Sequence, residues 1–371
     1  EAQLVPGATV HAYQYLAEVA HDFGAPIEPA PYSGPAARPV VKEHTAGPSL
    51  DLAEIQGQHE ARWALEIAAA GGHNLLLLGP PGAGKTMLAQ RLTTIMPVMD
   101  TTIALEHAAI HSLSEGRDMT TTLPERPPFE APHHAASVSA LIGGGSGIVR
   151  PGAVSKAHGG VLFLDEAAEF KRQVLDTLRQ PLETGKVMLH RARHTVEFPA
   201  AFQLVMATNP CPCGYGHGTG KACRCTSLQR RRYAAKLSGP LLDRVDLQVT
   251  VESLTSQHLA ARSSAESSAQ VAARVTRAAE RARHRLEPYG LRRNHQVPLQ
   301  LFTEPSLQVT YTGRRILEEA LDAQQISARG YGRIMRVAWT IADLLEVDRP
   351  SAEHVDMALY LRLNTSGGQY V

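Results

Sequence analysis

The feature that most constrains this chain is a glycine-rich loop at residues 79–86, which reads Gly-Pro-Pro-Gly-Ala-Gly-Lys-Thr. It directly follows Asn74–Leu78, a short apolar run typical of a strand buried in a parallel sheet. The residues after the loop have the spacing of a helix. A strand, a G-x-x-x-x-G-K-[ST] loop and a helix in this order form a phosphate-binding loop. The motif therefore predicts an α/β fold that binds a nucleoside triphosphate.

The residue types of this phosphate loop explain how it holds phosphate. Glycines let successive backbone N–H groups turn toward phosphate oxygens, and the helix N-terminus adds a favourable dipole. Lys85 supplies a positive charge to the β and γ phosphates, and the Thr86 hydroxyl is a ligand for Mg²⁺. The predicted ATP contacts are Gly79, Pro80, Pro81, Gly82, Ala83, Gly84, Lys85, Thr86 and Met87.

Two further apolar runs end in polar residues that fit the same chemistry. Val161–Leu164 is followed by Asp165 and Glu166, and Leu204–Ala207 is followed shortly by Asn209. Ligands of open α/β sheets bind at the carboxyl ends of the strands. We predict that Asp165 holds Mg²⁺ through water, that Glu166 is the general base, and that Asn209 orients the attacking water. The alternative for the asparagine is a turn residue before the proline that follows it.

Apolar strands alternate with helical segments over residues 51–253, which predicts a doubly wound α/β domain with a parallel sheet. Residues 254–371 show helical periodicity without strands, so we expect a separate helical domain. Residues 1–50 are expected to form an appendage with a helix at Val10–Phe23 and a linker at Gly24–Pro48. The predicted strands are Asn74–Leu78, Val161–Leu164, Gln203–Ala207 and Asp246–Val251. The predicted helices of the two domains are Gln58–Ala70, Met87–Met96, Lys171–Leu182, Gln270–Leu286, Gly313–Gln325, Gly332–Leu345 and Ala352–Leu363.

The composition excludes several classes of protein. Hydrophobic residues make up 43% of the chain and charged residues 20%, which excludes wholesale disorder. The net charge is +1, so a surface for nucleic acid has to be a local patch. The apolar runs are too short to span a membrane, and we expect a cytoplasmic protein with no membrane partner. Because the sequence starts without methionine, we expect that it was cut from a longer parent.

All four cysteines lie in one short segment, as Cys211-x-Cys213 and Cys223-x-Cys225. In a reducing cytoplasm four such thiolates favour a tetrahedral Zn²⁺ site, while iron–sulfur ligation and two disulfides are the alternatives. Residues 211–242 also contain six cations and no acid, which favours a nucleic-acid contact over a solvated basic loop. These cations are Lys221, Arg224, Arg230, Arg231, Arg232 and Lys236.

The pair His133-His134 is a further candidate for metal binding. Adjacent residues of a strand point to opposite faces and do not easily share one ion. We therefore predict that these histidines serve packing or a loop hydrogen bond.

The segment Ser238–Asp246 places Arg244 just before the last predicted strand. With the phosphate loop, the Asp-Glu strand and the Asn strand, it resembles the AAA+ ATPases, and more narrowly their magnesium-chelatase and MCM branch. The resemblance implies that Arg244 is the finger that reaches the γ-phosphate of a neighbouring subunit, where its guanidinium neutralises the transferred phosphoryl group. The alternative is a surface salt bridge with Asp243 or Asp246.

Residues 332–344 resemble the sensor-2 helix of the same family. Matched residue by residue, Arg336 is the sensor arginine and Arg333 the second candidate. Trp339 stands where close members usually carry another arginine. The alternative is a solvated helix face that carries basic residues.

Four stretches narrow the resemblance to the ComM/YifB group, magnesium-chelatase-like AAA+ proteins tied to natural transformation. They are Ala131–His134, Leu141–Ser146, Arg150–Gly152 and Asn209–Gly214. The resemblance covers about residues 50–371. Residues 4–24 resemble the tail of the Lon-like domain that precedes the motor in this group.

The resemblance implies two insertions that line the pore of a ring. The helix-2 insert is Leu141–Lys156, with Arg150 and Lys156 as candidate DNA contacts. The pre-sensor-1 hairpin is Lys186–Pro199, where apolar and polar residues alternate as in a two-stranded ribbon. A basic hairpin tip suits a phosphate backbone, and the alternative is a solvated hairpin without a ligand. The tip residues are Arg191, Arg193 and His194.

The sequence thus predicts an ATP-driven, ring-shaped DNA motor, expected to be a hexamer, that drives branch migration during recombination of incoming DNA. Two rival predictions remain. One is a chelatase-type subunit that inserts Mg²⁺ into a tetrapyrrole, and the other is an ATPase that remodels proteins. The basic hairpin tip and the basic cysteine segment favour DNA.

Overall fold

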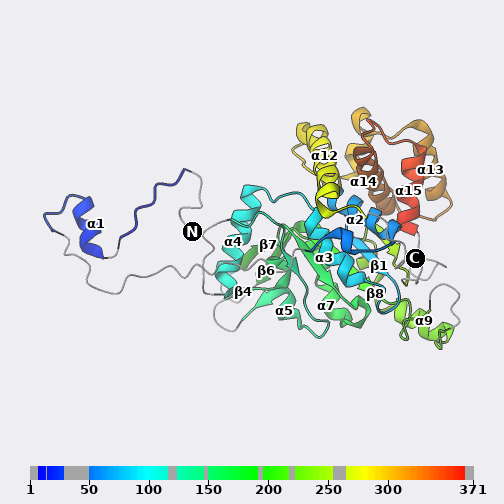
Figure 1. Cartoon of the computed structure of the whole chain (residues 1–371), viewed down its shortest axis with the longest axis horizontal. Helices are drawn as coiled ribbons and strands as arrows, with labels where there is room; N and C mark the ends of the chain where they lie inside the picture. Colours follow the sequence, from blue (N-terminus) through cyan, green and yellow to red (C-terminus); the bar gives the residue numbers. More distant parts are fainter. Residues whose placement is uncertain are drawn as a thin grey trace.

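The structure is a computed structural model, and it describes residues 7–13, 15–28, 50–115, 123–145, 149–190, 195–216, 222–253 and 265–363 (Figure 1). The helix predicted at Val10–Phe23 is shorter than expected, because α1 spans only Leu16–Asp22 and buries none of its residues. Figure 1 shows α1 apart from the rest of the structure. Most of the predicted linker lies outside the described residues.

A five-stranded parallel sheet forms the centre of the fold, with strand order β2-β5-β8-β1-β9. The four predicted strands are confirmed, and the strand of this sheet that the prediction missed is β2 at its edge, which is too short to show a periodic pattern. The strands are β1 (Leu75–Leu78), β2 (Phe129–Glu130), β5 (Val161–Leu164), β8 (Gln203–Thr208) and β9 (Leu247–Thr250).

Both faces of the sheet are covered, which explains why strands β1 and β5 are continuously apolar. In β1, Leu75 and Leu77 belong to one buried cluster, and Leu76 and Leu78 belong to a second on the opposite face. The first cluster includes α2 (His59–Gly71) and α3 (Lys85–Ile95), and the second includes the short helices that follow β5. The doubly wound arrangement of the α/β domain is therefore confirmed.

The helix predicted at Lys171–Leu182 is wrong as a single element. The chain forms α7 (Arg172–Asp176) and α8 (Arg179–Thr184) instead. Pro181 explains the interruption, because a proline inside a helix clashes with the carbonyl four residues earlier, here that of Thr177. The remaining helices of this half are α4 (Thr101–Glu115), α5 (Val138–Ile142), α6 (Ala153–Lys156), α9 (Ser227–Ala234) and α10 (Gly239–Leu242).

The four predicted C-terminal helices are present as α12 (Ser268–Leu286), α13 (Tyr311–Asp322), α14 (Ala328–Leu344) and α15 (Ala352–Leu363). Helix α12 packs on α2 and α3, and α14 packs on α2, so this helical lid covers one side of the sheet domain (Figure 1). One buried cluster runs from the sheet through α2 into all four helices. The lid therefore shares a continuous core with the sheet, and its division from the sheet domain at residue 253 stays a prediction.

Trp339 lies inside this lid rather than on a basic surface. Only 2% of the residue is exposed, its indole Nε1 donates a 2.8 Å hydrogen bond to the carbonyl of Leu307, and the Arg285 guanidinium lies 4.1 Å from its ring centroid. The side chain therefore fills the lid core and supplies a cation–π partner for Arg285.

Two small antiparallel ribbons project from the sheet domain. The predicted hairpin forms as β6 (Lys186–His190) and β7 (Thr195–Pro199), while Arg191, Arg193 and His194 lie outside the described residues. Within the helix-2 insert, β3 (Gly143–Gly144) pairs with β4 (Arg150–Pro151). In the part of the chain that is described, no helix has the length and apolar character needed to cross a membrane.

Candidate functional site

The carboxyl ends of three neighbouring strands bring together four of the predicted catalytic residues, which are Lys85, Asp165, Glu166 and Asn209. Strand β8 lies between β1 and β5, so Asn209 emerges between the phosphate loop after β1 and the two acids after β5. This is the edge of an open α/β sheet at which ligands bind. The sequence predicted that the polar residues after these strands meet at the carboxyl edge of the sheet, and the strand order agrees with that prediction. The roles of these residues stay predictions.

Lys85 lies at the centre of this edge. Its ammonium donates hydrogen bonds to the carbonyls of Gly79 (2.7 Å) and Pro80 (2.9 Å), and to Asn209 Oδ1 (3.1 Å). Burial lowers its pKa from the ordinary value, while the nearby acids Asp165 and Glu166 oppose that shift. The side chain is thus held in the loop as a cation whose present partners are carbonyl oxygens that a phosphate can replace.

The magnesium ligands predicted from the sequence lie side by side. The Thr86 hydroxyl, at the start of α3, donates a 2.8 Å hydrogen bond to Asp165 Oδ2. Mg²⁺ prefers oxygen ligands, keeps several waters, and accepts one or two protein groups besides phosphate. The hydroxyl and the carboxylate therefore fit a nucleotide-bound Mg²⁺, which they would hold directly or through one coordinated water.

Glu166 occupies an unusual backbone conformation. Its φ of 51° lies in the left-handed region, and its N–H donates to Asp165 Oδ1 at 2.9 Å. Its carboxylate Oε2 lies 3.1 Å from His134 Nδ1. Non-glycine residues in this region carry strain, which often marks a functional position. The turn after β5 therefore presents Glu166 at the strand edge, where His134 holds its carboxylate.

The prediction that His133 and His134 lie on a strand was wrong, because both residues lie in the loop after β2. Their ring centroids are 4.1 Å apart, so the rings lie together rather than on opposite faces. The Ala135 N–H donates to His133 Nδ1 at 3.2 Å, which is the loop hydrogen bond that the sequence predicted. The contact between His134 and Glu166 had no local sequence signal.

Arg244 lies at the opposite end of the sheet from Lys85. Its carbonyl accepts a 2.9 Å hydrogen bond from Asn74, just before β1, whereas the phosphate loop follows the end of that strand. Its guanidinium pairs with Glu183 of α8 and donates to the Pro240 carbonyl at 2.5 Å. The alternative salt-bridge partners Asp243 and Asp246 are thus not the ones observed. Arg244 therefore lies away from the phosphate loop of its own chain.

The sensor candidates also lie at this amino-terminal end. Arg333 donates to Asp246 Oδ1 at 2.5 Å and to the Arg244 carbonyl at 3.1 Å, and Arg336 donates to the Val297 carbonyl at 2.7 Å. Neither is a solvated surface residue, because both are mostly buried between the lid and the sheet. Both therefore lie away from the phosphate loop of the same chain.

Two arginines that were not predicted from the sequence lie at the same end of the sheet, next to Arg244. Arg329 of α14 lies 3.4 Å from Asp243, and Arg362 of α15 lies 3.7 Å from the same carboxylate and donates to the Val245 carbonyl. The Arg329 side chain is 74% exposed. Their only sequence signal is the basic character of two lid helices, which does not indicate where those helices pack.

The four cysteines form one compact group. The Cys211 sulfur lies 3.3 Å from that of Cys213 and 3.7 Å from that of Cys223, and all four sulfurs lie within 4.8 Å of one another. In a tetrahedral site with Zn–S bonds of about 2.3 Å, the sulfurs are roughly 3.8 Å apart. The cysteines are free thiols, and the group fits one Zn²⁺ ion.

The surroundings of the group favour a thiolate at Cys213. Backbone N–H groups of Tyr215 and Arg224 lower the pKa of Cys213 to about 6. Burial raises the pKa of Cys211 to about 12. A cation among the sulfurs stabilises all four thiolates and offsets the cost of burying Cys211.

The candidate DNA contacts are distributed over several elements. Arg150 of β4 is exposed and Lys156 of α6 is half-buried. In and before α9, Arg224, Arg231 and Arg232 are exposed and have no acidic partner among the described residues. Lys236 pairs with Glu169 instead.

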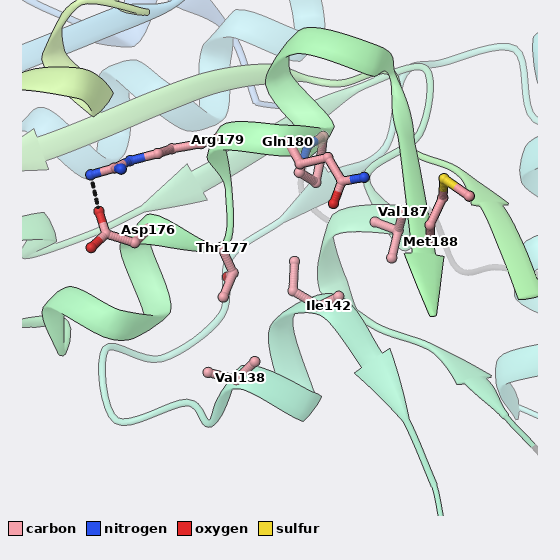
Figure 2. Close-up of a pocket in the computed structure, with 9 residues that line it drawn as sticks. Val138, Ile142, Asp176, Thr177, Arg179, Gln180, Val187 and Met188 are labelled. Carbon is pink, nitrogen blue, oxygen red and sulfur yellow. Dashed lines mark hydrogen bonds and ion pairs between the residues drawn. The ribbon is translucent and has the colours of Figure 1, made fainter. Parts of the chain in front are cut away.

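A pocket of about 320 Å³ lies away from the phosphate loop, between the helix-2 insert and the hairpin. Figure 2 shows Val138 and Ile142 of α5 on one side, Thr177 and Gln180 from the α7–α8 region above them, and Met188 of β6 beside them. Of the predicted site residues that the structure describes, none lines this pocket.

Comparisons with known proteins agree with this arrangement. The family model described as magnesium chelatase, subunit ChlI, matches residues 51–259, and its C-terminal counterpart matches residues 265–362. The chain is 44% identical to an uncharacterized protein of Mycobacterium tuberculosis over 98% of this chain and 70% of that protein. It is 44% identical to Competence protein ComM of Haemophilus influenzae over 88% of this chain and 64% of that protein.

A more distant relative is the magnesium-chelatase 38 kDa subunit of Cereibacter sphaeroides, 24% identical over 42% of this chain and 51% of that protein. The family matches cover both the sheet and the helical lid, and they confirm the resemblance drawn from the motifs. The chain therefore belongs to the magnesium-chelatase family of AAA+ ATPases.

Proposed function

We propose that this chain is the motor of a cytoplasmic, ring-shaped and hexameric DNA helicase. It would use ATP and Mg²⁺ to drive branch migration of incoming DNA in natural transformation and homologous recombination. Membership of an ATPase family supports the hydrolysis, and the name of the competence relative supports a role with DNA.

The observation that carries the DNA part is the position of the unpaired arginines around α9. Tyr233 at the end of α9 is buried, and it belongs to the same buried cluster as Leu204 and Met206 of β8. Arg231 and Arg232 therefore protrude from a helix that is anchored beside the nucleotide edge. Exposed cations without acidic partners suit a phosphate backbone. DNA bound there would act on the catalytic edge through β8.

The proposal of a ring is supported by the positions of the arginines and of Lys85 at opposite ends of the sheet. Arg244, Arg329 and Arg333 lie at the amino-terminal end, and Lys85 lies at the carboxyl end. An arginine that serves a γ-phosphate from this position must serve that of a neighbour, and the same holds for Arg336 as a sensor. Contacts of this head-to-tail kind close into rings when the rotation permits.

We also propose that Cys211, Cys213, Cys223 and Cys225 hold a structural Zn²⁺ ion. The sulfur separations support a single ion, because a cluster of several irons with its sulfides needs more space between the ligands. Four protein ligands close the coordination sphere, so the ion would support the fold of residues 211–225 and take no part in hydrolysis.

The test is the ATPase rate of the purified chain with single-stranded DNA, a porphyrin or an unfolded protein. Stimulation by DNA is expected, and the double variant Arg231→Gln/Arg232→Gln should lose it. The matched control is Arg314→Gln/Arg315→Gln, which alters two adjacent exposed arginines of α13. Stimulation by porphyrin alone would favour a chelatase subunit, which the family name and the chelatase relative support. Stimulation by unfolded protein alone would favour protein remodelling.

A further inference from the structure

We propose that the metal-bound cysteine loop braces the phosphate loop, so that nucleotide affinity depends on whether the metal is present. The inference rests on the zinc site and the nucleotide site proposed above. It adds that the two sites are in mechanical contact within one chain.

The first connection runs through β8. Asn209 accepts a 3.1 Å hydrogen bond from the Lys85 ammonium, and Cys211 follows only two residues later. Cys211 is fully buried. The position of the asparagine oxygen is therefore fixed on one side by the strand and on the other by a cysteine that the metal would hold.

The second connection is a direct packing contact between the two loops. A turn is closed by the Gly214 N–H, which donates to the Cys211 carbonyl at 2.9 Å. A Cβ added to Gly214 would lie 2.4 Å from Pro81 Cδ and 2.7 Å from Pro81 Cγ. The backbone of the cysteine loop thus touches the proline ring of the phosphate loop without a side chain between them.

Pro81 is otherwise exposed, and a Cβ built on its neighbour Gly82 would meet no atom within 4 Å. The tip of the phosphate loop therefore rests against Gly214 on one side and faces open space on the other. A loop whose N–H groups must point at phosphate is most effective when its conformation is held before the ligand arrives.

The metal determines whether Gly214 can serve as this support. It would join Cys211 and Cys213 to Cys223 and Cys225, and so close the loop that carries Gly214. Without the ion no disulfide joins these thiols, and the segment regains conformational freedom. Loss of the metal should therefore release Pro81 and lower the affinity for ATP.

The experiment measures zinc content and the Kd of a fluorescent ATP analogue on the full chain, without DNA. A nitrogen-donor chelator that leaves Mg²⁺ in solution removes the zinc under reducing conditions, and zinc alone is then restored. We expect the Kd to rise roughly tenfold on removal and to return on restoration, a typical size for the coupling between two binding sites. An unchanged Kd in zinc-free protein overturns the brace.

The contact is tested separately by Gly214→Ala, whose added methyl meets the Pro81 ring. The matched control is Gly290→Ala, because Gly290 has a similar positive φ of 69° and open space at its Cβ position. We expect a weaker Kd for Gly214→Ala and an unchanged Kd for the control. Pro81→Ala removes the clashing ring atoms, so Pro81→Ala/Gly214→Ala should regain affinity relative to Gly214→Ala.

The outcomes separate this inference from the proposals on which it rests. A double variant no better than Gly214→Ala, or an affinity equal in Gly214→Ala and the control, overturns the brace. If zinc and ATP both bind but do not affect each other, only the brace fails. A chain that never holds zinc, or that never binds ATP, refutes the proposed site itself and the brace with it.

Discussion

The hydroxyl of Thr86 donates a 2.8 Å hydrogen bond to the carboxylate of Asp165, although the two residues are 79 positions apart in the chain. This bond joins the start of α3 to the end of β5 across the intervening strand β8. It places two oxygen ligands where a Mg²⁺ ion bound to a nucleotide would lie.

Lys85→Ala and Glu166→Gln should separate nucleotide binding from hydrolysis. Lys85 would contact the phosphates of the bound ground state, so its loss should abolish binding. Glu166 would act only on the attacking water, so Glu166→Gln should bind ATP normally and lose at least about 100-fold in kcat. Equilibrium binding and steady-state hydrolysis measure the two effects. Wild-type turnover by Glu166→Gln would contradict the assignment of the general base.

Arg244→Ala should still bind ATP but hydrolyse it about 1,000-fold more slowly, because the guanidinium serves a neighbouring site. Mixing Arg244→Ala with Lys85→Ala subunits should restore partial activity, since some interfaces then pair an intact arginine with an intact phosphate loop. Hydrolysis is measured against mixing ratio, and assembly is followed by light scattering. Full activity of Arg244→Ala alone would exclude the arginine finger.

Metal analysis of the purified chain should find about one Zn²⁺ per chain. Cys211→Ser/Cys223→Ser should lose it, because each substitution removes one ligand from a different half of the site. Reaction with a thiol reagent should be slow in the zinc-loaded chain and fast after chelation. Retention of a full equivalent of zinc by the double variant would show that the ion binds elsewhere.

Buried histidines should destabilise the protein in mild acid. Burial lowers the pKa of His73 from 6.5 to about 3 and that of His295 to about 4. Between these values and pH 6.5 the unfolded chain binds more protons, so the free energy of unfolding falls as the pH falls below 6.5. Each histidine should contribute about 2 kcal/mol of that loss between pH 7 and pH 5.

Urea unfolding at several pH values measures this dependence. His73→Gln keeps a polar side chain near Thr340, the present partner of His73 Nε2 at 2.7 Å, but cannot take up a proton. Its free energy of unfolding should therefore change less between pH 7 and pH 5 than that of the wild type. An identical pH dependence would contradict the role of His73.

The sequence was sufficient for the elements whose signal is local. The phosphate loop, the apolar strands and the clustered cysteines each occupy a few consecutive residues, and their chemistry follows from residue type and spacing. Parallel strands also share one carboxyl edge, so the common location of Lys85, Asp165 and Asn209 could be inferred before any contact was known. The interruption of the helix predicted at Lys171–Leu182 could also have been predicted from the sequence, because Pro181 lies inside that helix.

Only the tertiary structure determined the contacts between distant segments. The pair of His134 with Glu166, the position of Arg329 beside Asp243, and the contact of Gly214 with Pro81 join loops and helices that no periodic pattern relates. A side chain's sequence neighbours fix its local backbone, but its partners depend on how the lid and the loops pack around the sheet. The sequence by itself therefore determined which groups the nucleotide edge contains. Packing decided which of them touch, because contact energies depend on three-dimensional distance and not on separation along the chain.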